Sequence, residues 1–160
     1  MADVTFDKLE GDNFTLAHIG KWADLDKYAF QHPKLPKPYP GKSFLKKELK
    51  LTGMEVSLNK LPPGTQMPFY HKHQENEELY LFIKGTGQFQ IDSQIVNVRE
   101  GSVIRVGCNG VRMWRNNSSE DLCFVVIQAK AQSLSGEDIS DGIGVEGTIE
   151  WPDPGTEEKD

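Results

Sequence analysis

The chain has 160 residues, of which 37% are hydrophobic and 26% charged, as expected for one globular domain with its own core. No apolar run approaches the roughly 18 residues of a membrane span, and no basic stripe supports nucleic-acid binding, so we expect neither a membrane nor a nucleic acid as partner. The N-terminus is polar and has no apolar signal region, which predicts a cytoplasmic protein.

Residues 1–46 are predicted to form an N-terminal arm with short elements. Asp24–Phe30 can form a short helix, and four prolines lie between Pro33 and Pro40. Proline fixes φ and removes a backbone donor, so this stretch is predicted to be extended. We expect it either to wrap around a neighbouring subunit or to cover the mouth of the core.

Residues 47–131 have the pattern of successive short β-strands. Apolar runs such as ELYLFIKG and DLCFVVIQAK are separated by turn residues, among them Pro62–Thr65 and Asp92–Gln94. The spacing of about 8–12 residues and the lack of a long amphipathic helix predict an all-β sandwich or barrel. The stretch QMPFYHKH is predicted to be one of the strands.

Residues 132–160 are predicted to be an acidic C-terminal segment whose end is disordered. Nine acidic residues and one lysine lie between Glu137 and Asp160, so this stretch carries a charge of −8 and the rest of the chain sums to +2. We interpret it as a solvating segment.

The stretch HKHQENEEL contains the strongest candidate for a metal site. Alternate residues of a strand point to one face, so His71 and His73 are expected to project side by side. Two imidazoles and one carboxylate suit several first-row metal ions. The alternation leaves both Glu77 and Glu78 open as the carboxylate, and two hydrogen-bonded core histidines are an alternative to a metal.

The spacing around these histidines resembles the first conserved motif of the cupin family. That motif is Gly, five residues, His-x-His, three or four residues, Glu, six residues and Gly. Here Gly64, His71, His73, Glu78 and Gly85 match it, with six residues in place of five after the first glycine. The resemblance therefore selects the second of the two adjacent glutamates.

The second cupin motif is Gly, five residues, Pro-x-Gly, two residues, His, three residues and Asn. Gly101 and Asn116 match its ends, whereas Gly107 and Asn109 stand at the positions of its Pro and Gly. Arg112 stands where the histidine belongs. The frame of the motif is kept, and its metal-binding residue is replaced.

The resemblance implies a cupin-type double-stranded β-helix, a jelly-roll barrel. It also implies that His71, His73 and Glu78 hold a divalent first-row transition metal such as Zn, Fe, Mn or Ni inside the barrel. Arg112 cannot be the fourth ligand, because a guanidinium stays protonated and has no lone pair to donate.

Three arrangements of Arg112 are open. The guanidinium can replace the metal and pair with Glu78; it can bind an anionic substrate beside a three-ligand metal; or it can turn outward at the barrel mouth. If it points inward, alternation places Trp114 and Asn116 inward as well. Together with Tyr80 and Phe69, these residues are the predicted substrate-binding set.

Two classes of function follow from this set. One is a metal-dependent oxygenase or isomerase that acts on a small polar or anionic molecule. The other is a non-catalytic binding or sensing module in which Arg112 replaces the metal. One fold hosts many functions, so the fold does not decide between them. Small cupins commonly dimerise through arms and edge strands, and we therefore expect a homodimer.

Overall fold

A computed structural model of the protein describes residues 6–33, 35–134, 141–148 and 150–151. Its strands are β1 (Asp7–Glu10), β2 (Thr15–His18), β3 (Ala29–Phe30), β4 (Tyr39–Pro40), β5 (Lys42–Phe44), β6 (Glu55–Leu61), β7 (Asn76–Lys84), β8 (Thr86–Ile91), β9 (Gln94–Arg99), β10 (Val103–Val106), β11 (Arg112–Arg115) and β12 (Leu122–Lys130). The helices are the short 3-10 helix η1 (Trp22–Lys27) and the single turn α1 (Lys46–Leu49). The chain is thus mostly β, as predicted.

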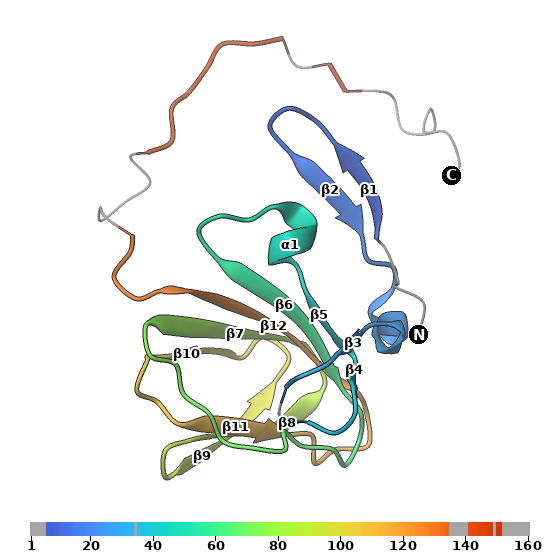
Figure 1. The fold of residues 1–160 in the computed structure, drawn as a ribbon, viewed down its shortest axis with the longest axis vertical. Helices are drawn as coiled ribbons and strands as arrows, with labels where there is room; N and C mark the ends of the chain where they lie inside the picture. Colours follow the sequence, from blue (N-terminus) through green and yellow to red (C-terminus); the bar gives the residue numbers. More distant parts are fainter. Residues whose placement is uncertain (1–5, 34, 135–140, 149, 152–160) are drawn as a thin grey trace.

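Two antiparallel sheets face each other and form the body of the protein (Figure 1). The larger sheet has the strand order β10-β7-β12-β6-β5, and the smaller has the order β11-β8-β9. In the larger sheet β12 pairs with both β6 and β7, so strands from the two ends of the 47–131 region lie side by side. This two-sheet arrangement confirms the predicted jelly-roll class.

The main core fills the space between the two sheets. Strand β7 shows why: Glu78, Tyr80 and Phe82 are buried, whereas the intervening Leu79 and Leu81 are exposed on the other face. The buried cluster comprises Leu61, Tyr80, Phe82, Phe89, Val98, Val106, Trp114, Leu122, Phe124 and Val126. The predicted alternation of the strands therefore builds the wall of the interior.

The N-terminal region covers the outer face of the larger sheet. Figure 1 shows the β1–β2 hairpin and α1 on the side of that sheet away from the smaller one. A second apolar cluster joins Phe6, Leu25 and Tyr28 to Leu58 of β6. The helix predicted over Asp24–Phe30 overlaps the 3-10 helix η1, but it is wrong at its end, where Ala29 and Phe30 form strand β3.

The larger sheet begins before residue 47, the predicted start of the barrel, because strand β5 already pairs with β6. In the C-terminal segment, residues 132–134, 141–148 and 150–151 form no helix or strand, and the expected disorder of its end falls on residues 152–160, which lie outside the described residues. None of the helices in the described part of the chain is long and apolar enough to span a membrane.

Candidate metal centre and ligand cavity

The segment that carries the two histidines runs beside β11 without being a continuous strand. It forms isolated bridges at Gln66–Arg115 and His71–Arg112. The main chains of His71 and Arg112 exchange two hydrogen bonds, of 3.1 and 3.0 Å. The prediction of a regular strand here is wrong, and Pro68 is one reason, since proline has no N–H for the ladder. The bridges nevertheless hold the histidines beside β11.

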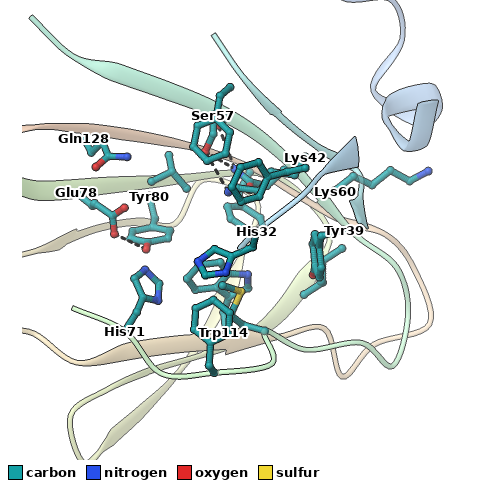
Figure 2. Close-up of a pocket in the computed structure, with 18 of the residues that line it drawn as sticks. His32, Tyr39, Lys42, Ser57, Lys60, His71, Glu78, Tyr80, Trp114 and Gln128 are labelled. Atoms are coloured by element: carbon teal, nitrogen blue, oxygen red, sulfur yellow. Dashed lines mark hydrogen bonds between the residues drawn. The ribbon is translucent and has the colours of Figure 1, made fainter. Parts of the chain in front are cut away.

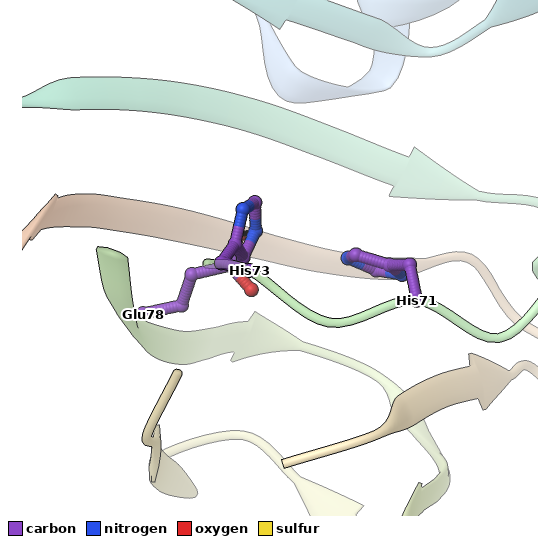
Figure 3. Close-up of side chains that lie close together, drawn as sticks. All are labelled: His71, His73 and Glu78. Carbon is purple, nitrogen blue, oxygen red and sulfur yellow. Dashed lines mark ion pairs between the residues drawn. The ribbon is translucent and has the colours of Figure 1, made fainter. Parts of the chain in front are cut away.

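The structure brings His71, His73 and Glu78 together, as the motif predicts (Figure 3). One potential ligand atom from each residue lies within 4.8 Å of the other two. The two imidazole rings are 5.6 Å apart between centroids and almost perpendicular. Glu78 is buried beside the two histidines, whereas the neighbouring Glu77 pairs with Arg105 near the surface.

Two nitrogens of this cluster are buried without a hydrogen bond. Among the described residues, nothing forms a hydrogen bond with Nδ1 of His71 or with Nε2 of His73. The latter lies 3.0 Å from Oε1 of Glu78, a short approach that is not aligned as a hydrogen bond. Buried polar atoms normally have a partner, so these two atoms fit ligands that converge on a shared cation.

The two oxygens of Glu78 have different surroundings. Oε2 accepts hydrogen bonds from Nε of Arg112 at 3.0 Å, from Nη2 of the same guanidinium, and from the Tyr80 hydroxyl at 2.6 Å. Oε1 faces His73. Burial alone would raise the pKa of the carboxyl, but the contacts with His73, Tyr80 and Arg112 outweigh it and lower the pKa to about 2. The carboxylate is therefore ionised at neutral pH.

Arg112 has no exposed surface, so the outward arrangement is excluded. Its Nε and Nη2 are directed at Glu78, and Nη1 donates to the carbonyl of Gly110 at 2.9 Å. Arg112 thus pairs with Glu78, as in the first of the three arrangements that the sequence left open. The guanidinium does not belong to the lining of the adjacent cavity.

The electrostatics of His71 favour its neutral form. Burial lowers its pKa to about 4, and the positive charge of Arg112 acts in the same direction, partly opposed by Glu78. A neutral imidazole is the form that binds a metal ion. A neutral His71 and an ionised Glu78 therefore match two members of the donor set expected for a divalent first-row metal.

A cavity of about 340 Å³ adjoins the cluster (Figure 2). Its surface is mainly apolar, and its aromatic lining residues include Phe30, Phe44, Phe69, Tyr80, Trp114 and Phe124. Three members of the predicted substrate-binding set, Phe69, Tyr80 and Trp114, thus line it. Asn116 does not: its side-chain amide donates to the carbonyls of Leu61 and Glu120, at 2.8 and 2.6 Å, and joins two loop ends.

Several lining residues come from the N-terminal region, where sequence reasoning placed no site residue. His32, Leu35 and Tyr39 of the proline-rich arm form part of the wall, in agreement with the expectation that the arm covers the core. Lys42 of β5 also lines the cavity. In the sequence, the one indication of a strand here is the alternation of Lys42 and Phe44 around Ser43. This pattern is too short to be recognised directly after the proline-rich stretch.

Comparisons with known proteins agree with this architecture. The family model described as a cupin domain matches residues 57–128. A solved structure of a cupin protein from Bacteroides fragilis is 33% identical, with 74% of this chain and 98% of that chain covered and a TM-score of 0.64. No curated protein gives a significant match.

More distant structures share the fold alone. A sugar phosphate isomerase from a cupin superfamily, from Silicibacter pomeroyi, is 20% identical with a TM-score of 0.51, and the match covers 57% of this chain and 60% of that one. A Klebsiella pneumoniae protein with a double-stranded beta-helix domain is 17% identical with a TM-score of 0.52, over 69% and 90%. The chain therefore spans less than two thirds of the isomerase.

Proposed function

The chain belongs to the cupin family, and from that premise we propose that it binds a divalent first-row transition metal ion through His71, His73 and Oε1 of Glu78. The neighbouring cavity would take a small molecule that reacts at, or is held beside, this centre. Zn, Fe, Mn and Ni all accept two imidazoles and one carboxylate. The homodimer and the cytoplasmic location remain predictions.

The convergence of His71, His73 and Glu78 carries this proposal. Leaving the buried Nδ1 of His71 without a hydrogen bond costs free energy. A shared cation removes this cost. The structural alternative, two hydrogen-bonded core histidines, is met only in part: His73 lies 3.0 Å from Oε1 of Glu78, whereas Nδ1 of His71 has no hydrogen bond within the described part of the chain.

The residues around the centre have distinct tasks in this proposal. Arg112 and Tyr80 hold Oε2 of Glu78, so that Oε1 is kept in a fixed orientation toward the histidines. The aromatic cavity wall excludes water from the bound molecule. A metal held by these residues would supply Lewis acidity or redox chemistry, as an isomerase or an oxygenase requires.

A second candidate is a binding or sensing module without a metal. The Arg112–Glu78 pair favours it, because the guanidinium already neutralises the one carboxylate of the cluster. A dication placed near this guanidinium is repelled unless an anion lies between them. In this version His71 and His73 are part of the wall of a pocket for a small molecule.

Elemental analysis distinguishes the two candidates. The protein is purified without chelator or nickel resin, and its metal content is normalised to protein concentration. We expect about one equivalent of a first-row metal in the wild type and its loss in His73→Ala. His18→Ala is the matched control, because His18 is exposed on the N-terminal hairpin. Less than about a tenth of an equivalent after incubation with Zn, Fe, Mn and Ni would reject the metal centre.

A further inference from the structure

Among the described residues, Lys42 is the one lysine of the cavity wall that is neither exposed nor paired with a carboxylate. Its Nζ donates to Oδ1 of Asn59 at 2.6 Å and lies 3.4 Å from Oγ of Ser57. It also stands 4.8 Å from the centroid of the Phe44 ring. An ammonium has three donors, so one N–H remains for a further acceptor.

The other lysines of the wall differ from Lys42. Lys60 is buried, and its Nζ pairs with Asp26 and lies 3.4 Å from Asp121. Lys72 is exposed. Burial lowers the pKa of Lys42 to about 8, although the charges of Glu78 and Glu55 act in the opposite direction. At neutral pH the cavity therefore contains a mostly protonated ammonium, and a charge removed from water is costly without a counter-ion.

A rigid polar network holds this ammonium in place. Lys42 and Asn59 are directly opposite each other in the β5–β6 ladder. The Asn59 amide donates to the carbonyl and to the hydroxyl of Ser57, both at 3.1 Å, and the side chains of Asn59 and Ser57 are buried. The ammonium is thus preorganised, which reduces the entropy that ligand binding costs.

The other residues of the cavity wall limit the size and the polarity of the ligand. The surface of the cavity is mostly apolar, and the volume of about 340 Å³ equals roughly eleven water molecules at ~30 Å³ each. Such a space suits a compact apolar molecule of about a dozen non-hydrogen atoms. Figure 2 shows Lys42 across the cavity from Glu78 and His71, so an anion held by Lys42 leaves the rest of the molecule near these two residues.

We propose that Lys42 is the anion-binding group of this cavity and that the ligand is a small aryl or alkyl carboxylate. One unpaired ammonium matches one carboxylate charge. A phosphate dianion calls for a second cation, but Arg112 and Lys60 are occupied by Glu78 and by Asp26, and Lys72 is exposed. The placement of the ligand beside the metal centre rests on the proposed function, whereas carboxylate binding at Lys42 does not.

Isothermal titration calorimetry on EDTA-treated protein tests the carboxylate site without the metal. The probes are phenylacetate and hexanoate, each compared with its uncharged amide and with phenyl phosphate. We expect at least one carboxylate to bind about tenfold or more tightly than its amide, and this preference to disappear in Lys42→Met. Lys84→Met, at an exposed position on β7, should keep the preference.

Three results would overturn the inference: no preference for either carboxylate over its amide, an unchanged preference in Lys42→Met, or tighter binding of phenyl phosphate than of both carboxylates. If Lys42→Met fails to fold, Lys42→Gln replaces it, because a Gln amide keeps two donors for the Asn59 and Ser57 network. Carboxylate binding without metal uptake would reject the proposed metal centre and leave this inference intact. Metal uptake without a preference for carboxylates would reject this inference and leave the proposed metal centre intact.

Discussion

Arg112 directs two of its guanidinium nitrogens at the same oxygen of Glu78, and this arrangement leaves the other carboxylate oxygen facing His73. The two residues are 34 positions apart in the chain, on β11 of the smaller sheet and β7 of the larger. The pair therefore links the two sheets across the interior. It also keeps the carboxylate ionised, which is the form that a metal ion requires.

Replacing Arg112 by Met should lower the free energy of unfolding by about 3–5 kcal/mol, because Glu78 would remain buried without its cation. Urea unfolding of the metal-free protein measures this loss. Arg105→Met is the matched control, since Arg105 forms an ion pair with Glu77 in which the arginine side chain is 70% exposed. An exposed pair contributes about 0–1 kcal/mol. Equal losses in the two variants would contradict the structural role of the buried pair.

Replacing Arg112 by His should strengthen metal binding. The change removes a positive charge from the neighbourhood of the cation and adds an imidazole, so we expect affinity for Zn to rise by about tenfold or more. Competition with a fluorescent zinc chelator gives the affinity. Arg112→Gln separates the two causes, because it removes the charge without adding a ligand.

The outcome also tests the second candidate function. If the wild type binds no metal and Arg112→Gln does, then the guanidinium stands in place of the metal. If neither Arg112→His nor Arg112→Gln binds metal more tightly than the wild type, repulsion by Arg112 does not control the site.

Stability of the metal-free protein should fall as the pH falls from 7 to 2. The pKa of His71 is lowered from 6.5 to about 4, so between these values the unfolded chain binds a proton that the folded chain excludes. The pKa of Glu78 is lowered from 4.5 to about 2, so its contribution is present above pH 4.5 and is lost as the pH falls toward 2. Both groups therefore act in the same direction.

Chemical denaturation at a series of pH values checks this dependence. His71→Gln should flatten the profile between pH 6.5 and 4, because the titrating imidazole is absent. His18→Gln, at an exposed position, should leave the profile as in the wild type. A His71→Gln profile as steep as that of the wild type would show that His71 is not the source of the slope.

Replacing Asn116 by Ala should reduce stability without changing ligand affinity. Its side chain donates to the carbonyls of Leu61 and Glu120 and accepts from the backbone N–H of Ser118. Loss of these buried hydrogen bonds should cost about 1–3 kcal/mol in thermal or urea unfolding. The adjacent exposed Asn117→Ala is the control. A tenfold or larger loss of phenylacetate affinity in Asn116→Ala would instead support the substrate-binding role predicted from the sequence.

The sequence by itself determined the strand-rich region and the three clustered residues. Alternation along a strand is local, so the pattern of β7 already places Glu78, Tyr80 and Phe82 on one face. The spacing of His71 and His73 likewise places both imidazoles on one side of the chain, even though the segment forms bridges and no regular strand. These features depend on residues close together in the chain, and the motif adds the choice between Glu77 and Glu78.

Only the tertiary structure decided what surrounds these residues. The sequence left three arrangements of Arg112 open, because its partner depends on how β11 and β7 face each other across the interior. It assigned Lys42 to an arm, whereas pairing with β6 places this residue in the cavity wall. It placed Asn116 beside the substrate, whereas the amide bonds to Leu61, 55 residues away. Contacts between distant segments follow from the packing of the two sheets, which no local pattern of residues encodes.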